Sequence, residues 1–159
     1  MAEIRPINPN SPEEINLVAE RMRLTLMEVV NDDEGSKMYS MEWLVDRVRF
    51  HLDPTQCDGA IFLAVEGEAI VGHTIVRIES GEGYFSTFYV VPEARRQSIA
   101  SEFVRVGEAW MRDRGMTAAR TNTAKDNTKL QNLLFGFGYK IDVKSDTMVS
   151  LTRQIGSKP

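Results

Sequence analysis

Apolar residues recur along this chain at two different spacings, and each spacing predicts one kind of element. In four segments they return every three or four positions, which is the period of an amphipathic helix. Ser11, Pro12 and Glu14 mark the start of the first helix, because a serine cap, an early proline and a glutamate three positions later are typical of helix N-termini. The predicted helices cover residues 12–29, 41–52, 99–114 and 127–137.

Runs rich in β-branched and aromatic residues, bounded by turn-forming residues, predict seven strands. Two of these runs flank a short turn at Glu66, Gly67 and Glu68, and they predict a hairpin. The predicted strands cover residues 3–7, 61–65, 69–78, 84–91, 116–123, 139–143 and 147–153. The order β-α-α-β-β-β-α-β-α-β-β indicates a mixed α/β (α+β) fold, and a length of 159 residues predicts one domain over residues 1–159.

Composition and charge narrow the class of protein. The chain is 42% hydrophobic and 26% charged, as is ordinary for a globular domain. Its net charge of −4 and its dispersed Lys and Arg residues argue against nucleic acid as a partner. Charges near the N-terminus and short apolar runs argue against a signal peptide and a membrane partner, so we expect a cytoplasmic protein. Cys57 is the only cysteine and lies in no metal-binding pattern, so we expect neither a disulfide within the chain nor a metal.

The segment from Val90 to Ala100 carries the clearest chemical signal. A strand runs into a turn that contains Arg95 and Arg96, and a long helix follows. The unpaired N–H groups of a helix start and two guanidinium groups together make an anion site. The small side chains of Ser98 and Ala100 allow a ligand to approach the backbone. A solvated arginine pair before an ordinary capped helix would explain the same residues.

The same segment resembles the acetyl-CoA motif of the GNAT superfamily, in which a strand ending in an aliphatic-x-Pro step precedes Gln/Arg-x-x-Gly-x-Gly/Ala. Arg95 falls on the first position of this motif, Ser98 on its first glycine and Ala100 on its last position. A second family pattern, Asn-x-x-Ala-x-x-x-Tyr-x-x-x-Gly-Phe, is matched in spacing but with substitutions. The matching residues are Asn127, Leu130, Leu134, Gly138 and Tyr139. The resemblance covers roughly residues 60–153, hairpin turn included, and implies a GNAT-like, mostly antiparallel central sheet of about seven strands flanked by about four helices.

The resemblance implies an N-acetyltransferase with acetyl-CoA as its acyl donor. It places the pyrophosphate on the backbone N–H groups of residues 96–101, the pantetheine arm along residues 88–90, and the thioester in a splay between the fourth and fifth strands. An N–H group near Tyr89 or Val90 would polarise the acetyl carbonyl. The implied cofactor-binding residues are Phe88, Tyr89, Val90, Arg95, Arg96, Gln97, Ser98, Ile99, Ala100, Ser101 and Asn127.

The sequence departs from the family pattern at three places. Ser98 replaces a residue that is usually glycine, and its hydroxyl would either bind the pyrophosphate or cap the helix. Leu134 stands where many relatives have the tyrosine that protonates the leaving thiolate. Tyr84 and Asn122 stand where different branches have a catalytic glutamate.

Acid and base candidates are therefore few. Glu82 and Glu79 lie near the mouth of the fourth strand and could accept a proton through water, although a solvated turn explains them better. Tyr84 has the best position to line the cleft, and Tyr84 and Glu82 are the residues that we nominate for catalysis. His73, isolated on a strand, is expected to pack or to lie at the surface rather than to catalyse. His51 is expected to interact with the C-terminal end of its helix.

No motif names the acceptor. Ser86 and Thr87 could line the cleft, and the acidic residues Asp32, Asp33 and Glu34 could attract a cationic amine, although a solvated loop explains them too. We expect the acceptor to be a primary amine of a small molecule or protein that attacks acetyl-CoA directly in a ternary complex. The alternatives are a non-catalytic acetyl-CoA sensor and an acyltransferase with a longer acyl group or a hydroxyl acceptor; a homodimer is left open.

Overall fold

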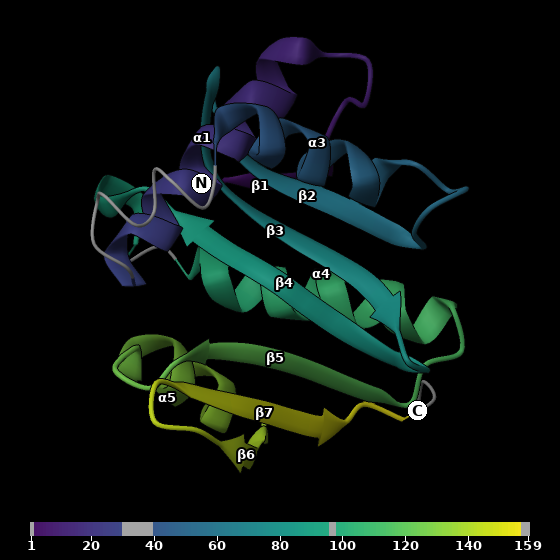
Figure 1. Cartoon of the computed structure of the whole chain (residues 1–159), viewed down its shortest axis with the longest axis vertical. Helices are drawn as coiled ribbons and strands as arrows, with labels where there is room; N and C mark the ends of the chain where they lie inside the picture. The colour runs from purple at the N-terminus through teal and green to yellow at the C-terminus, as the bar shows by residue number, and fades with distance from the viewer. Residues whose placement is uncertain (1, 30–39, 96–97, 157–159) are drawn as a thin grey trace.

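One mixed sheet of seven strands organises the chain (Figure 1). The computed structural model describes residues 2–29, 40–95 and 98–156. The strands are β1 (Glu3–Pro6), β2 (Gly59–Glu66), β3 (Ala69–Glu79), β4 (Glu82–Val90), β5 (Ala118–Ala124), β6 (Lys140–Lys144) and β7 (Met148–Gln154). They lie in the order β1-β2-β3-β4-β5-β7-β6, and only the β4–β5 pair is parallel. The predicted mixed, mostly antiparallel fold is thereby confirmed.

Helices cover both faces of this sheet. They are α1 (Pro12–Val29), α3 (Met41–Leu52), α4 (Ile99–Asp113) and α5 (Thr128–Gly136), with a short 3-10 helix η1 (Pro92–Ala94) after β4. α1 and α3 share a buried cluster with Leu63 and Ile75 on one face. α4 and α5 share another with Val76 and Phe85 on the opposite face, and Figure 1 shows α4 crossing behind β3 and β4. No helix among the described residues has the length and apolarity needed to cross a membrane.

Local chemistry accounts for where the helices begin. The Ser11 hydroxyl accepts a hydrogen bond from the Glu14 N–H at 3.2 Å, as the sequence predicted. The Ser40 hydroxyl accepts one from the Trp43 N–H at 3.1 Å at the start of α3. The predicted elements all form, and their bounds shift by only a few residues, as is usual at frayed ends.

The buried face of α4 differs from the apolar stripe that its sequence suggests. Gly107 and Glu108 are buried, whereas Trp110 is only half-buried. Gly107 is needed because a Cβ there would lie 2.3 Å from the Phe85 ring, so the missing side chain lets α4 approach β4. Glu108 can be buried because its carboxylate accepts a hydrogen bond from the Tyr139 hydroxyl at 2.6 Å and pairs with two arginines. These arginines are Arg112 and Arg153.

β4 and β5 pair over a short stretch and then diverge. They pair only between residues 83–85 of β4 and residues 119–121 of β5, although β4 runs on to Val90 and β5 to Ala124. The β3 partners step from Thr87 directly to Phe85, so Ser86 is an extra residue in β4 and forms a β-bulge. The bulge lies where the two strands diverge, and the splay implied by the family resemblance is therefore present.

Candidate active site

A continuous cleft opens where β4 and β5 diverge. Its inner pocket has a volume of about 270 Å³ and is lined by Met22, Thr25, Trp43, Arg47, Ser86, Thr87, Phe88, Thr121, Asn122, Thr123, Asn127 and Leu130. Its outer pocket, of about 530 Å³, is lined by Thr25, Phe88, Tyr89, Val90, Arg95, Ser98, Ala100, Ser101, Asn127, Lys129, Leu130 and Leu133. Four residues line both pockets, and so the two form one cleft. These residues are Thr25, Phe88, Asn127 and Leu130.

The part of β4 that borders the cleft has backbone groups with no strand partner. The Val91 N–H donates to the Val71 carbonyl at 2.8 Å, so Val91 and Val71 form a hydrogen-bonded pair in the β3–β4 register. Hydrogen-bonded and non-hydrogen-bonded pairs alternate along antiparallel strands. The Tyr89 N–H, two residues before Val91, therefore also points toward β3, whereas the N–H groups of Phe88 and Val90 point toward β5. β5 has diverged at this point. Of the two residues implied for polarising the acetyl carbonyl, only Val90 therefore presents its N–H to the cleft, and Phe88 presents a second one.

The turn before α4 forms the far wall of the outer pocket. The Arg95 Nε donates to the Val90 carbonyl at 2.9 Å and ties the turn to the end of β4. Ser98, Ala100 and Ser101 line the pocket, and the N–H groups of the first helical turn have no acceptor within the helix. Ile99 turns its buried side chain away, into a cluster with Phe103. Arg96 and Gln97 lie outside the residues that the structure describes.

Ser98 has a left-handed backbone, with φ of 61° and ψ of 22°. This conformation costs a residue with a Cβ about 1–2 kcal/mol, which explains physically why glycine suits the position. The Ser98 side chain makes no capping hydrogen bond to α4. The expectation that its hydroxyl caps the helix is therefore wrong, because the left-handed backbone is not the extended one from which a serine caps. The hydroxyl remains at the wall of the outer pocket.

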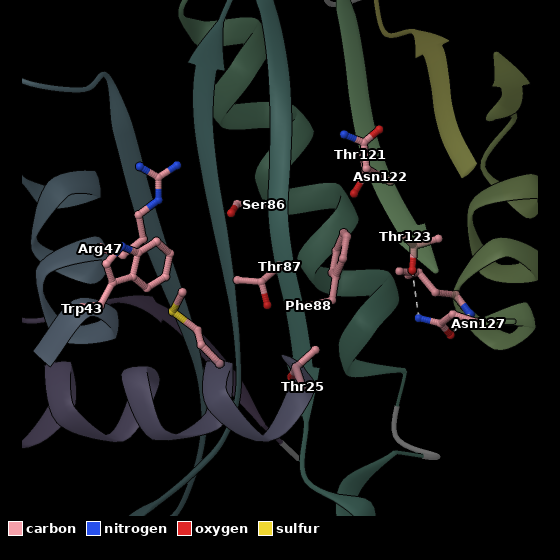
Figure 2. A pocket seen from close by; sticks show the side chains of 12 residues that line it. Thr25, Trp43, Arg47, Ser86, Thr87, Phe88, Thr121, Asn122, Thr123 and Asn127 are labelled. Carbon is pink, nitrogen blue, oxygen red and sulfur yellow. Dashed lines mark hydrogen bonds between the residues drawn. The ribbon is translucent and has the colours of Figure 1, made fainter. Parts of the chain in front are cut away.

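Asn127 sits where the two pockets join. Its Oδ1 accepts a hydrogen bond from the Leu130 N–H at 3.3 Å and caps α5, while its Nδ2 donates to the Thr123 hydroxyl at 3.1 Å (Figure 2). Asn127 thus fixes the start of α5 to the end of β5. Leu134, one helical turn beyond Leu130, is fully buried in the core and lines neither pocket.

The two residues nominated for catalysis lie in a separate hollow of about 200 Å³. Glu82 pairs with Arg120 at 3.0 Å, and hydrogen bonds to Asp142 and Glu82 raise the pKa of Arg120. The Tyr84 hydroxyl accepts a hydrogen bond from the Asn122 Nδ2 at 3.3 Å, and Asn122 lines the inner pocket. Tyr84 is thus linked to the cleft through Asn122, whereas Glu82 is paired with Arg120 outside the cleft.

Both histidines are buried structural residues. His73 is fully buried and stacks on Tyr89, and burial lowers the pKa of His73 to about 3. His51 interacts with its helix as expected, through a 2.9 Å hydrogen bond from Nδ1 to the Arg47 carbonyl. Its Nε2 faces Arg77 at 3.0 Å, and burial lowers the pKa of His51 to about 4. Neither imidazole lines the cleft.

The sequence did not single out the wall of the inner pocket that α3 supplies. Figure 2 shows Trp43 and Arg47 on one side of Ser86 and Thr87, with Asn122 across the cleft. Trp43 is 45% exposed and lies off the apolar stripe of its helix, and an off-stripe tryptophan is the one local signal that could have marked this wall. The acidic residues Asp32, Asp33 and Glu34 lie outside the described residues.

Comparison with known proteins agrees with the fold. The Acetyltransferase (GNAT) family model matches residues 25–139, so the chain belongs to this family of acyltransferase enzymes. None of the curated proteins matches it.

Solved structures share the fold at low sequence identity. The PaiA N-acetyltransferase from Thermoplasma acidophilum in complex with coenzyme A is 16% identical, with a TM-score of 0.78 over 97% of this chain and 99% of that one. An aminoglycoside 6'-N-acetyltransferase complexed with coenzyme A is 16% identical, with a TM-score of 0.74 over 99% of each chain. Ard1 from Thermoplasma volcanium is 17% identical, with a TM-score of 0.72 over 96% of this chain and 97% of that one.

Proposed function

We propose that this protein transfers an acetyl group from acetyl-CoA to the primary amine of an acceptor that binds in the inner pocket. The observation that carries the proposal is the continuity of the cleft. One end borders the N-terminus of a long helix, the middle borders unpaired backbone groups of β4, and the other end is a small pocket. These three parts would fit a ligand such as acetyl-CoA. Its anionic nucleotide would lie at the helix end, its extended arm with amide groups along β4, and its reactive thioester at the inner pocket.

The outer pocket fits coenzyme A on its own residues. The first-turn N–H groups of α4 and the positive end of its helix dipole favour a pyrophosphate. Lys129, on α5, adds a cation to the lining of the same pocket. The N–H group of Val90, in the outer pocket, is aligned to bond an extended pantetheine arm as an added strand would. Two of the similar structures contain coenzyme A, which supports the same assignment.

The inner pocket would perform the transfer in a ternary complex. Acetyl-CoA supplies a thioester, whose carbonyl carbon the neutral amine attacks and whose sulfur leaves as a thiolate. The N–H group of Phe88, a residue that lines the inner pocket, would stabilise charge on the carbonyl oxygen. No carboxylate or imidazole lines the inner pocket among the described residues, so the amine proton would leave through water that contacts the hydroxyl groups of the lining. These hydroxyl groups belong to Ser86, Thr87, Thr121 and Thr123.

A non-catalytic acetyl-CoA sensor is the second candidate function. It is favoured by the burial of Leu134, which puts an inert side chain at the position of the usual proton donor. A leaving thiolate needs less acid assistance than an alkoxide, and we therefore prefer the enzyme. A cytoplasmic location stays a prediction of the sequence, and a homodimer stays open.

The test combines binding with turnover. Calorimetry should show acetyl-CoA binding, and a panel of amines with detection of the released thiol should show turnover. Acetyl-CoA that binds without turnover on any amine would support the sensor. Absence of binding at millimolar acetyl-CoA would contradict both functions.

A further inference from the structure

The inner pocket has an unusual charge for an amine-binding site. Arg47 is the only charged side chain among the described residues that line it. The rest of the lining consists of neutral polar groups and the apolar side chains of Met22, Trp43, Phe88 and Leu130. An acceptor that carries several positive charges would therefore meet a cation here and no carboxylate on these residues.

The Arg47 side chain stacks on a neighbouring ring and donates no hydrogen bond to another residue that the structure describes. Its guanidinium lies 4.5 Å from the centre of the Phe50 ring, which is a stacking contact. It forms no salt bridge with any carboxylate in the part of the chain that the structure describes, whereas Arg77 and Arg120, which flank the neighbouring hollow, pair with Glu79 and Glu82. A half-buried guanidinium with its N–H edge available matches a carboxylate in shape and charge.

Trp43 and Met22 supply an apolar surface beside this cation. Trp43 is 45% exposed and lines the inner pocket from the same helix as Arg47, one turn earlier. Met22 reaches the pocket from α1. The pocket volume of about 270 Å³ is at the small end for ligand sites, so it suits a small molecule rather than a folded surface.

We propose that the acceptor is a small amine that also carries a carboxylate, as an apolar amino acid does, with Arg47 binding the carboxylate and Trp43 the apolar side chain. The amine would then point across the pocket toward the bulge at Ser86, where β4 leaves β5 and where the thioester is proposed to lie (Figure 2). This inference rests on the proposed acetyl transfer, and Arg47 sets its specificity.

The experiment compares matched acceptors that differ only in the carboxylate. Apolar amino acids and their amides, together with spermidine and an aminoglycoside, are offered to the protein with acetyl-CoA, and thiol release is measured. We expect kcat/KM to be at least about tenfold higher for an amino acid than for its amide, since a charge-assisted pair is lost. Arg47→Gln should remove this preference. Arg49→Gln, on the same helix but outside the cleft, should keep it.

A binding readout makes the test independent of turnover. With coenzyme A bound, the amino acid should raise the melting temperature of the wild type and not of Arg47→Gln, and its amide should raise neither. Equal use of acid and amide, or better use of spermidine or the aminoglycoside, would overturn the carboxylate assignment while leaving acetyl transfer intact. Failure to bind acetyl-CoA would instead remove the proposed function itself.

Discussion

The Asn122 side chain on β5 donates a hydrogen bond to the Tyr84 hydroxyl on β4, at 3.3 Å, beside the point where the two strands part. Asn122 lines the inner pocket, whereas Tyr84 lies in the neighbouring hollow with Glu82. Tyr84 can therefore act on the cleft by orienting the Asn122 amide. The Tyr84 side chain itself lines neither the inner nor the outer pocket.

This relationship predicts a modest effect for Tyr84→Phe. We expect kcat to fall by less than about tenfold, because a direct acid or base contributes about 10²–10⁴. Asn122→Ala should have a similar effect, and the double variant should lose no more than either single one, since the two residues act as a unit. A loss of a hundredfold or more in Tyr84→Phe would show that its hydroxyl takes part in the reaction directly.

Ser98→Gly should stabilise the protein by about 1 kcal/mol, because glycine adopts the left-handed backbone without steric cost. Chemical unfolding would measure this gain. Ser80, at φ of 52° in the β3–β4 turn, is the matched control, and Ser80→Gly should gain stability with unchanged acetyl-CoA affinity. For the role of the hydroxyl, Ser98→Ala keeps the Cβ, so weaker acetyl-CoA binding by this variant would show that the hydroxyl binds the donor.

Leu134→Tyr should destabilise the protein by about 1–3 kcal/mol, because Leu134 is fully buried and a larger side chain overpacks the core. The exposed Phe135 on the same helix provides the control Phe135→Tyr, which should leave the melting temperature unchanged. The rate of acetyl transfer should change little, since a thiolate leaves readily. A hundredfold gain in turnover would mean that the native protein lacks a needed acid, and would favour the sensor.

Stability should fall as the pH decreases from about 7.5 to 5. Burial lowers the pKa of His51 to about 4 and that of His73 to about 3, so the unfolded chain takes up protons from about pH 6.5 downward while the folded chain does not. Each histidine then costs about 1.4 kcal/mol of stability per pH unit until its folded pKa is reached. Urea unfolding at several pH values would measure the slope.

His73→Leu separates the two contributions. Neither ring nitrogen of His73 has a hydrogen-bond partner within the described residues, so an apolar side chain of similar size should keep or raise the stability at pH 7. The same variant should also reduce the change of stability with pH, so that only the contribution of His51 remains. An unchanged slope in this variant would contradict the assignment of His73.

The spacing of apolar residues determined the helices and strands of this protein, because burial of one face requires only that apolar side chains recur at the period of the element. Turn-forming and capping residues determined where most of these elements begin, as Ser11 does for α1. The motif residues Arg95 and Asn127 both line the outer pocket, and the sequence could group them because its family pattern covers elements that follow one another along the chain.

Tertiary structure alone decided the other half. Arg47 and Trp43 reach the inner pocket from α3, about forty residues before β4 in the sequence, and no local pattern records which helix will face which strand. The bulge at Ser86 depends on the register with β3. Glu108, which the helical pattern would expose, is buried only because Tyr139 and Arg153, distant in sequence, arrive to satisfy its carboxylate. Contacts of this kind depend on how the sheet and helices pack, and packing is a property of the whole chain.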